Sequence, residues 1–186
     1  MSAVAIPEVK IATWNIDPVH SNALFKVKHM MISNVRGEFT AIKGSLLFDP
    51  ENVENSRVEA EIDATSINTK DPQRDTHLKS ADFFDVEKFP TLSFRSSKVS
   101  KSGDGELVVA GPLTIHGITR DVVFKVEGPS EPAKDPWGNI RIGLSATTRI
   151  NRKEFGLTWN AALETGGILV GDEVTITLDV QFIKAN

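Results

Sequence analysis

The sequence predicts an all-β protein whose strands form one antiparallel sheet closed into a barrel. Apolar and polar residues alternate with a period of two along most of the chain, which is typical of strands with one buried and one solvated face. The alternating runs are long, about 10–12 residues against the usual five or six, and turn residues separate them. A sandwich of two sheets has the same pattern, but roughly eight or nine long strands favour a barrel, because closure leaves no exposed edge.

Five segments show the alternation most clearly. In the segment 138–150, for example, Ile142 and Leu144 fall on one face, and Arg141 and Ser145 fall on the other. The connections between segments are rich in Gly, Pro, Asn and Asp, which turns favour. The five segments are residues 21–30, 56–67, 118–128, 138–150 and 173–183, and further strands are predicted at about 10–17, 35–48, 90–99 and 106–115.

Residues 65–89 interrupt the strands, and a short helical insertion is predicted there at about 71–85. Asp71 and Pro72 match an N-cap and a first helical position. Ser80 matches a second helix start. The two predicted helical pieces are residues 72–79 and 81–85.

The side chains of this insertion divide into a polar and an apolar face. The polar face is either solvated surface or the rim of a cavity mouth, and the apolar face either plugs the core or forms a pocket wall. The sequence leaves open whether this cover is a static plug or a lid that moves. The polar set is Arg74, Asp75, His77 and Lys79, and the apolar set is Leu78, Phe83 and Phe84.

Composition excludes several functional classes. A chain of 186 residues with 40% hydrophobic and 25% charged residues predicts one domain, residues 1–186, with residues 1–12 as an N-terminal extension. It contains no cysteine, so disulfides and thiolate sites are excluded. A net charge of −4 with scattered basic residues argues against a nucleic-acid partner, and no apolar run is long enough for a membrane span. No secretory signal is visible, so we expect a cytoplasmic location, or a periplasmic one if a signal has been removed.

The sequence shows no pattern of catalytic or metal-ligating residues. The histidines at positions 20, 29, 77 and 116 have none of the spacings of zinc motifs, and neither a nucleophile elbow nor a phosphate-binding glycine loop occurs. We therefore predict no catalytic residue and no metal. One alternative is an enzyme acting on an amphiphile, with His77 and Asp75 as acid and base. Another is a filled barrel that serves as a stress-response interaction module.

The predicted inward faces mix small and large side chains. Ala23, Ala60, Ala64 and Ala146 are the clearest small ones. They leave room for a guest, since an eight-stranded barrel can hold one small ligand, or they fit the taper of a filled barrel. The ligand cavity is the favoured interpretation.

Four segments of the sequence carry a resemblance to a known family: WNIDPVHSNALFKVKHM, SINTKDPQRDTHLKSADFFDVEKFPTLSF, GPLTIHGITRDVVF and NRKEFGL. Together, between Trp14 and Ile183, they resemble the YceI-like proteins, which are bacterial lipocalin-like, polyisoprenoid-binding proteins. The resemblance implies an eight-stranded lipocalin-like barrel that holds a long isoprenoid tail without catalysis, with the polar head near one opening. It also implies a possible homodimer, and many members of the family are periplasmic.

The resemblance places a lipid against the apolar positions of the barrel and the insertion, and it implies no cofactor besides this bound lipid. Each buried CH₂ contributes about 0.8 kcal/mol, so few polar contacts are needed. A phosphate head would need a cation such as Arg36, Arg74 or Lys79, and a quinone head a neutral donor such as Asn68 or His77. The predicted ligand-binding residues are Phe25, Val27, Phe39, Ile62, Leu78, Phe83, Phe84, Phe94, Val109, Leu113, Phe124, Ile142, Leu144, Leu157, Trp159 and Ile176.

Overall fold

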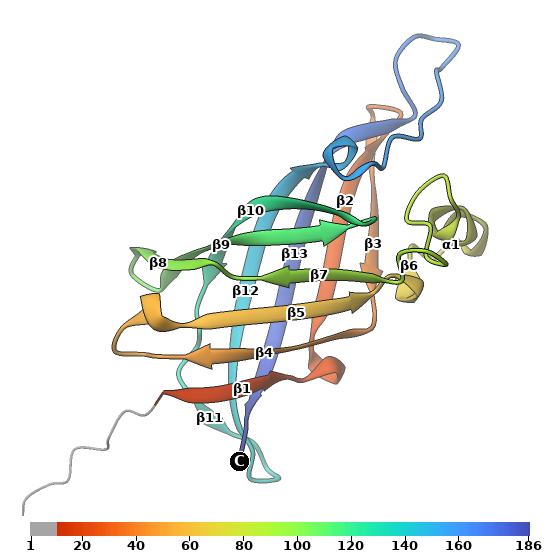
Figure 1. The fold of residues 1–186 in the computed structure, drawn as a ribbon. Helices are drawn as coiled ribbons and strands as arrows, with labels where there is room; N and C mark the ends of the chain where they lie inside the picture. Colours follow the sequence, from red (N-terminus) through yellow and green to blue (C-terminus); the bar gives the residue numbers. More distant parts are fainter. Residues whose placement is uncertain (1–10) are drawn as a thin grey trace, which may run out of the picture.

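The computed structural model describes residues 11–186, which form an eight-stranded antiparallel barrel with one α-helix outside it (Figure 1). The fold class predicted from the sequence is thus confirmed. The predicted N-terminal extension at residues 1–12 lies outside the described residues except for its last two positions, and Ala12 already begins the first strand.

The described residues contain thirteen strands, one α-helix and four short 3₁₀ helices. The helix is α1 (Pro72–Lys79), and the 3₁₀ helices are η1 (Pro18–His20), η2 (Val53–Asn55), η3 (Ala64–Ser66) and η4 (Arg152–Phe155). The strands are β1 (Ala12–Ile16), β2 (Asn22–His29), β3 (Ser33–Phe39), β4 (Ile42–Phe48), β5 (Arg57–Asp63), β6 (Ile67–Asn68), β7 (Thr91–Arg95), β8 (Lys98–Gly103), β9 (Glu106–Ile115), β10 (Ile118–Glu127), β11 (Ala133–Lys134), β12 (Ile140–Asn151) and β13 (Val170–Lys184).

Several of these strands are pieces of one long barrel strand. β13 pairs with β2 where Ile176 faces Phe25, and with β1 where Phe182 faces Ile16, so β1 and β2 follow each other along one edge of β13. β4 pairs with β1, and β3 pairs with β2. On the far side, β5 pairs with β4, and β6 pairs with β3. β7 and β8 both pair with β9. The barrel is therefore a meander of eight long strands, the first four each broken once, and β13 closes it by pairing with β12.

The predicted strand at residues 35–48 contains one of these breaks. The chain leaves the ladder between β3 and β4, and the Ala41 amide donates to Ser66 Oγ (3.1 Å). The predicted strand at about 90–99 breaks in the same way between β7 and β8, where Ser96 Oγ accepts from the Val58 amide (2.9 Å). Serine side chains thus replace ladder hydrogen bonds at the breaks, which an alternation of polar and apolar residues does not reveal.

The helical insertion is confirmed in its first piece and wrong in its second. α1 begins after Asp71, whose Oδ1 accepts hydrogen bonds from the amides of Gln73 and Arg74 (both 3.1 Å). Residues 81–85 form turns. Asp85 has a φ of 47°, in the left-handed region, and an α-helix does not continue through that conformation.

The inward faces of the strands form the core as predicted. On β10, Val122, Phe124 and Val126 are buried, whereas Val123 between them is 58% exposed on the outer face. Figure 1 shows β4, β5, β7 and β9 crossing over β12, β13 and β2, and the core lies between these two halves of the barrel. The period of two in the sequence therefore identifies which side chains face inward.

One guanidinium joins three segments at the start of β12. Arg141 donates from Nη1 to Asp17 Oδ2 (2.5 Å), just before η1, and from Nε to Asp135 Oδ2 (2.7 Å), just before β12. The hydrogen bond from Arg141 lowers the pKa of Asp17 to about 2. At Asp135, burial raises the pKa, but hydrogen bonds from Arg141 and Asn139 outweigh it. The pKa of the Asp135 carboxyl therefore also lies below its usual range.

We expect the substitution Arg141→Met to lower the free energy of unfolding at neutral pH, and this loss to shrink in acid. The pKa of Asp17 is depressed in the folded state. Its contribution to the free energy of unfolding is therefore complete at a pH well above the ordinary pKa of 3.8, and it is lost as the pH falls through about 2. Denaturant unfolding of both proteins at neutral pH and in increasing acid measures the difference. If the difference in free energy of unfolding between the two proteins stayed constant down to pH 2, the stabilising role given to the Arg141–Asp17 hydrogen bond would be contradicted.

Candidate functional site: an apolar cavity inside the barrel

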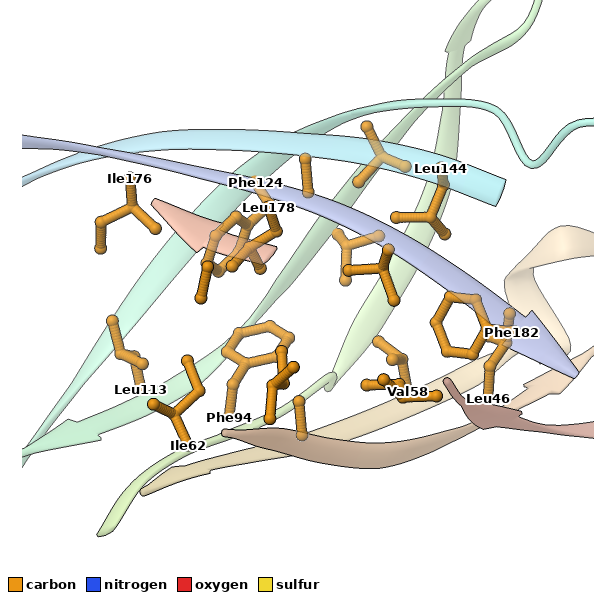
Figure 2. A pocket seen from close by; sticks show the side chains of 18 of the residues that line it. Leu46, Val58, Ile62, Phe94, Leu113, Phe124, Leu144, Ile176, Leu178 and Phe182 are labelled. Atoms are coloured by element: carbon orange, nitrogen blue, oxygen red, sulfur yellow. The ribbon is translucent and has the colours of Figure 1, made fainter. Parts of the chain in front are cut away.

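A cavity of about 150 Å³ lies inside the barrel. Ile62 on β5, Phe94 on β7 and Leu113 on β9 form part of one wall, and Ile176 and Leu178 on β13 form part of the other. Figure 2 shows these side chains pointing toward one another across the space between the strands. Both halves of the barrel thus contribute to the same cavity.

The cavity follows the length of the barrel and is apolar throughout. Leu107 and Pro129 line it at the end of the β8–β9 turn, and Phe39 and Ile115 line it toward the end that carries α1. Within residues 11–186 its wall has no acidic, basic or histidine side chain, and its only polar side chains are two serines. A guest would therefore gain mainly from burial of apolar surface.

Nine of the sixteen predicted ligand-binding residues border this cavity. Among them, Phe94 and Phe124 meet edge to face, with ring centroids 5.0 Å apart and an interplanar angle of 75°. Phe94 comes from β7 and Phe124 from β10, which pair with the two edges of β9, and both rings point into the space between the strands (Figure 2). The nine residues are Phe25, Phe39, Ile62, Phe94, Val109, Leu113, Phe124, Leu144 and Ile176.

The structure places the other seven away from the cavity wall, so their predicted contact with a ligand stays a prediction. Val27 lies on β2 beyond Phe25, opposite Val174 and toward the β2–β3 turn. Ile142 and Leu157 are buried in the core next to other side chains. The remaining four belong to the insertion and to the connection between β12 and β13: Leu78, Phe83, Phe84 and Trp159.

His77, Phe83 and Trp159 form an aromatic cluster that fastens the insertion to the β12–β13 connection. The His77 ring lies 5.1 Å from the Phe83 ring and 4.7 Å from the Trp159 ring, centroid to centroid, and Phe83 lies 5.3 Å from Trp159. His77 Nε2 is 2.8 Å from Asp82 Oδ2, which orients the ring. The His77 ring therefore packs against aromatic side chains while its Nε2 keeps a polar partner at the surface.

Phe84 connects the insertion to the cavity. Its ring meets Phe39 edge to face at 5.6 Å, and Phe39 in turn lies 5.7 Å from Phe25. Phe39 and Phe25 both border the cavity, whereas Phe84 does not. The Phe39 ring thus lies between the insertion and the cavity.

None of the five head-group candidates borders the cavity, as the wall described above contains none of Arg36, Asn68, Arg74, His77 and Lys79. Arg74 donates from Nε to Thr69 Oγ1 and from Nη2 to Thr69 O (both 2.8 Å). Asn68 Oδ1 accepts from the Lys70 amide (2.9 Å). Arg74 and Asn68 are thus hydrogen-bonded within the insertion, and His77 is held by Asp82 and by the aromatic cluster.

The acid–base pair of the enzyme alternative is not formed. Asp75 Oδ1 accepts from the amide (2.9 Å) and the hydroxyl (2.6 Å) of Thr69, whereas His77 contacts Asp82. Residues two apart on a helix do not face each other, which explains why His77 and Asp75 diverge. The structure thus gives His77 and Asp75 separate hydrogen-bond partners.

The cavity wall also contains inward residues that the predicted ligand set omits. They include Val58, Ala60, Ala146, Leu178 and Phe182. The alternation of their strands already places these residues on the inner faces, so the signal for them was present in the sequence.

Arg152 shapes the loop that carries Trp159, and no spacing pattern singles it out. Its buried guanidinium donates to the main-chain oxygens of Leu157 (2.6 Å), Gly171 (2.8 Å), Trp159 (2.9 Å) and Val170 (3.3 Å). A planar fork with five donors suits this set of carbonyls, and a lysine would not. The only sequence signal for Arg152 was its place in the segment NRKEFGL.

Other kinds of site find no support in the part of the chain that the structure describes. Its His, Asp and Glu side chains form no group of three or more that could hold a metal ion. None of its helices has the length and apolar character needed to cross a membrane.

The fold and the cavity define an antiparallel barrel with an apolar interior. Residues 14–182 match the YceI-like domain, and the chain belongs to the YceI-like family. A UPF0312 protein of Vibrio cholerae is 38% identical over 159 residues, covering 84% of each chain. A UPF0312 protein of Staphylococcus aureus is 37% identical over 174 residues, covering 92% of this chain and 98% of the relative.

Solved structures share the barrel. The YCEI protein of Campylobacter jejuni has a TM-score of 0.72 and 30% identity, over 87% of this chain and 91% of that chain. BcnA of Burkholderia cenocepacia has a TM-score of 0.76 at 23% identity, over 89% and 98% of the two chains. A polyisoprenoid binding domain from Saccharophagus degradans has a TM-score of 0.67 at 13% identity, over 95% and 100%. These last two likenesses show the fold alone.

We expect the substitution Trp159→Ala to loosen the insertion without unfolding the barrel. The variant loses two aromatic contacts that hold His77 and Phe83, each worth about 0.5–1.5 kcal/mol beyond its buried area. Hydrogen exchange of residues 72–89 should become on the order of tenfold faster, while exchange in β9 and β10 stays unchanged. Equal acceleration in the strands would show that Trp159 supports the whole barrel.

Proposed function

We propose that this protein binds the apolar tail of a long isoprenoid lipid inside the barrel and carries or stores it without chemical change. The observation that carries the proposal is the apolar cavity, which runs along the barrel and to whose wall residues 11–186 contribute no charged side chain. The choice of an isoprenoid follows the family resemblance, and one protein that shares the fold is named as a polyisoprenoid binding domain.

The size of the cavity sets a condition on this binding. A cavity of about 150 Å³ holds one benzene-sized group, which is much less than a tail of tens of carbons. A longer tail therefore has to displace side chains, and the Phe94–Phe124 pair stands in its path. Burial of each CH₂ stabilises the complex by about 0.8 kcal/mol. The free-energy costs of this rearrangement and of ordering the ligand reduce the total.

The polar head of the lipid would remain outside the cavity, because the described part of the chain places no charged group on the wall to receive it. The same absence favours a carrier over an enzyme, since an acid or base must reach the reacting atoms to act on them. Whether the head is a phosphate or a quinone is decided by identifying the lipid itself.

Organic extraction of the purified protein followed by mass spectrometry tests the proposal. We expect a long-chain isoprenoid lipid in amounts comparable to the protein. An extract without lipid, from a protein that also fails to take up an added isoprenoid, would refute the proposal and favour the filled-barrel alternative.

A cavity-filling variant provides the matching control. Ala146 borders the cavity opposite Leu178, and Ala146→Leu adds three carbons to the lipid's space. Loss of two or three buried CH₂ groups of the ligand corresponds to roughly 2 kcal/mol, or more than tenfold in affinity. Val123→Leu, on the outer face of β10, should leave the bound amount unchanged. Equal lipid content in Ala146→Leu and wild type would place the ligand elsewhere.

A further inference from the structure

The β2–β3 turn carries three exposed apolar side chains in succession. Met30 is 38% exposed, Met31 58% and Ile32 77%. Met30 and Met31 are also the only methionines within residues 11–186. Residues 30–32 are here named the MMI tip. Their side chains are exposed at the end of the barrel.

The backbone of the MMI tip is unusual for its residues. The Ile32 amide donates to the His29 carbonyl (3.1 Å), and the two residues between them, Met30 and Met31, have φ values of 52° and 60°. Positive φ at both central positions is typical of a type I′ turn, where Asn and Gly are strongly preferred. The protein therefore keeps two large apolar side chains where the backbone favours small polar residues.

The MMI tip projects from the end of the barrel and is braced there. β2 continues five residues from the cavity residue Phe25 to Met30, which at about 3.3 Å per residue is roughly 16 Å. The Met30 amide donates to the Leu169 carbonyl (2.8 Å), and Asn160 Oδ1 accepts from the Leu169 amide (3.1 Å). Figure 1 shows the β2–β3 turn and the β12–β13 connection at the same end of the molecule. The tip is thus a supported projection.

Basic side chains flank the MMI tip. Lys26 and Lys28 on β2 and Arg36 on β3 form no ion pair within the residues that the structure describes, and no acidic residue occurs in the sequence between Asp17 and Glu38.

Two of the three acids of the neighbouring strand β13 lie next to cations of their own, and the third, Asp179, lies opposite Asn22 at the far end of β2. On β13, Asp172 lies 3.2 Å from Lys153, and Glu173 lies 3.9 Å from Arg149. The β2–β3 strands are therefore locally basic in a chain whose net charge is −4.

We propose that the MMI tip inserts into the surface of a lipid bilayer that contains anionic lipids, and that the barrel loads or releases its ligand there. Apolar side chains next to lysines match the two layers of such a surface, because the side chains enter the acyl boundary and the cations face the head groups. The proposal rests on the lipid-binding function proposed above, since it names the surface from which the ligand would come.

Vesicle co-sedimentation tests this surface. Wild type should bind vesicles of phosphatidylcholine with phosphatidylserine, and bind phosphatidylcholine alone more weakly. The variant Met30→Asn/Met31→Asn/Ile32→Ser should lose on the order of tenfold or more in partition, because its apolar side chains are gone. Its melting temperature should be unchanged or higher, because Asn tolerates the left-handed conformation better than Met.

Two further variants separate the contributions. Lys26→Gln/Lys28→Gln should weaken binding to the anionic vesicles and reduce its salt dependence, with little effect on neutral ones. Trp137→Ser is the matched control, because Trp137 is 81% exposed but lies in the turn before β12, at the other end of the barrel. Its vesicle binding should equal that of wild type.

Three outcomes would overturn the proposal: wild type that ignores both vesicles, a tip variant that binds as well as wild type, or wild type that dimerises through the tip without binding vesicles. Uptake of a detergent-solubilised isoprenoid is measured in parallel. Wild type that takes up this isoprenoid but ignores vesicles would refute the membrane surface and leave the proposed function standing.

Discussion

Closure of the sheet by β13 is the interaction on which the rest of the structure depends. Its 15 residues pair with β12 along one edge and with β1 and β2 along the other, so the last strand joins the beginning of the chain to its end. Without this strand the meander would have two long open edges, and its apolar face would be exposed to water. With it, every inward side chain faces another wall of the same sheet.

Closure also explains why the barrel encloses a cavity lined mainly by apolar side chains. A barrel of eight strands has an interior just wide enough for side chains, and here small residues such as Ala60 and Ala146 leave part of it empty. Two sets of contacts hold the insertion, which lies outside this cavity. The aromatic cluster around His77 ties the insertion to the loop that Arg152 shapes, and Phe84 rests against the cavity residue Phe39. The insertion therefore lies one side chain away from the space where a ligand would move.

The sequence predicted the strands, their inner faces and the helix at Asp71, because alternation and capping are local signals. It did not predict contacts between residues far apart in the chain. The pairing of Arg141 with Asp17 spans 124 positions, and the edge-to-face contact of Trp159 with His77 joins the insertion to the loop after β12. Trp159 was expected on the ligand wall because it is large and apolar, but composition does not tell which of two apolar surfaces such a residue covers.

The head-group candidates show the same limit. Arg74 was chosen for its charge, yet its donors are bound by Thr69 five residues earlier, within the insertion. The alternating segment at residues 21–30 includes Met30 in a predicted strand, and the turn at residues 30–32, with its positive φ values and its exposure, could be seen only in three dimensions. Local pattern thus gave the scaffold and the inner faces, and tertiary contacts decided which side chains border the cavity.

The most direct test of the lipid-binding account is photo-crosslinking with an isoprenoid that carries a diazirine near the end of its tail. The account predicts labels on residues inside the barrel, such as Phe94, Leu144 and Leu178, with competition by unlabelled isoprenoid. Labels confined to outer-face residues such as Val123, or labels in the barrel that unlabelled isoprenoid does not compete away, would contradict it.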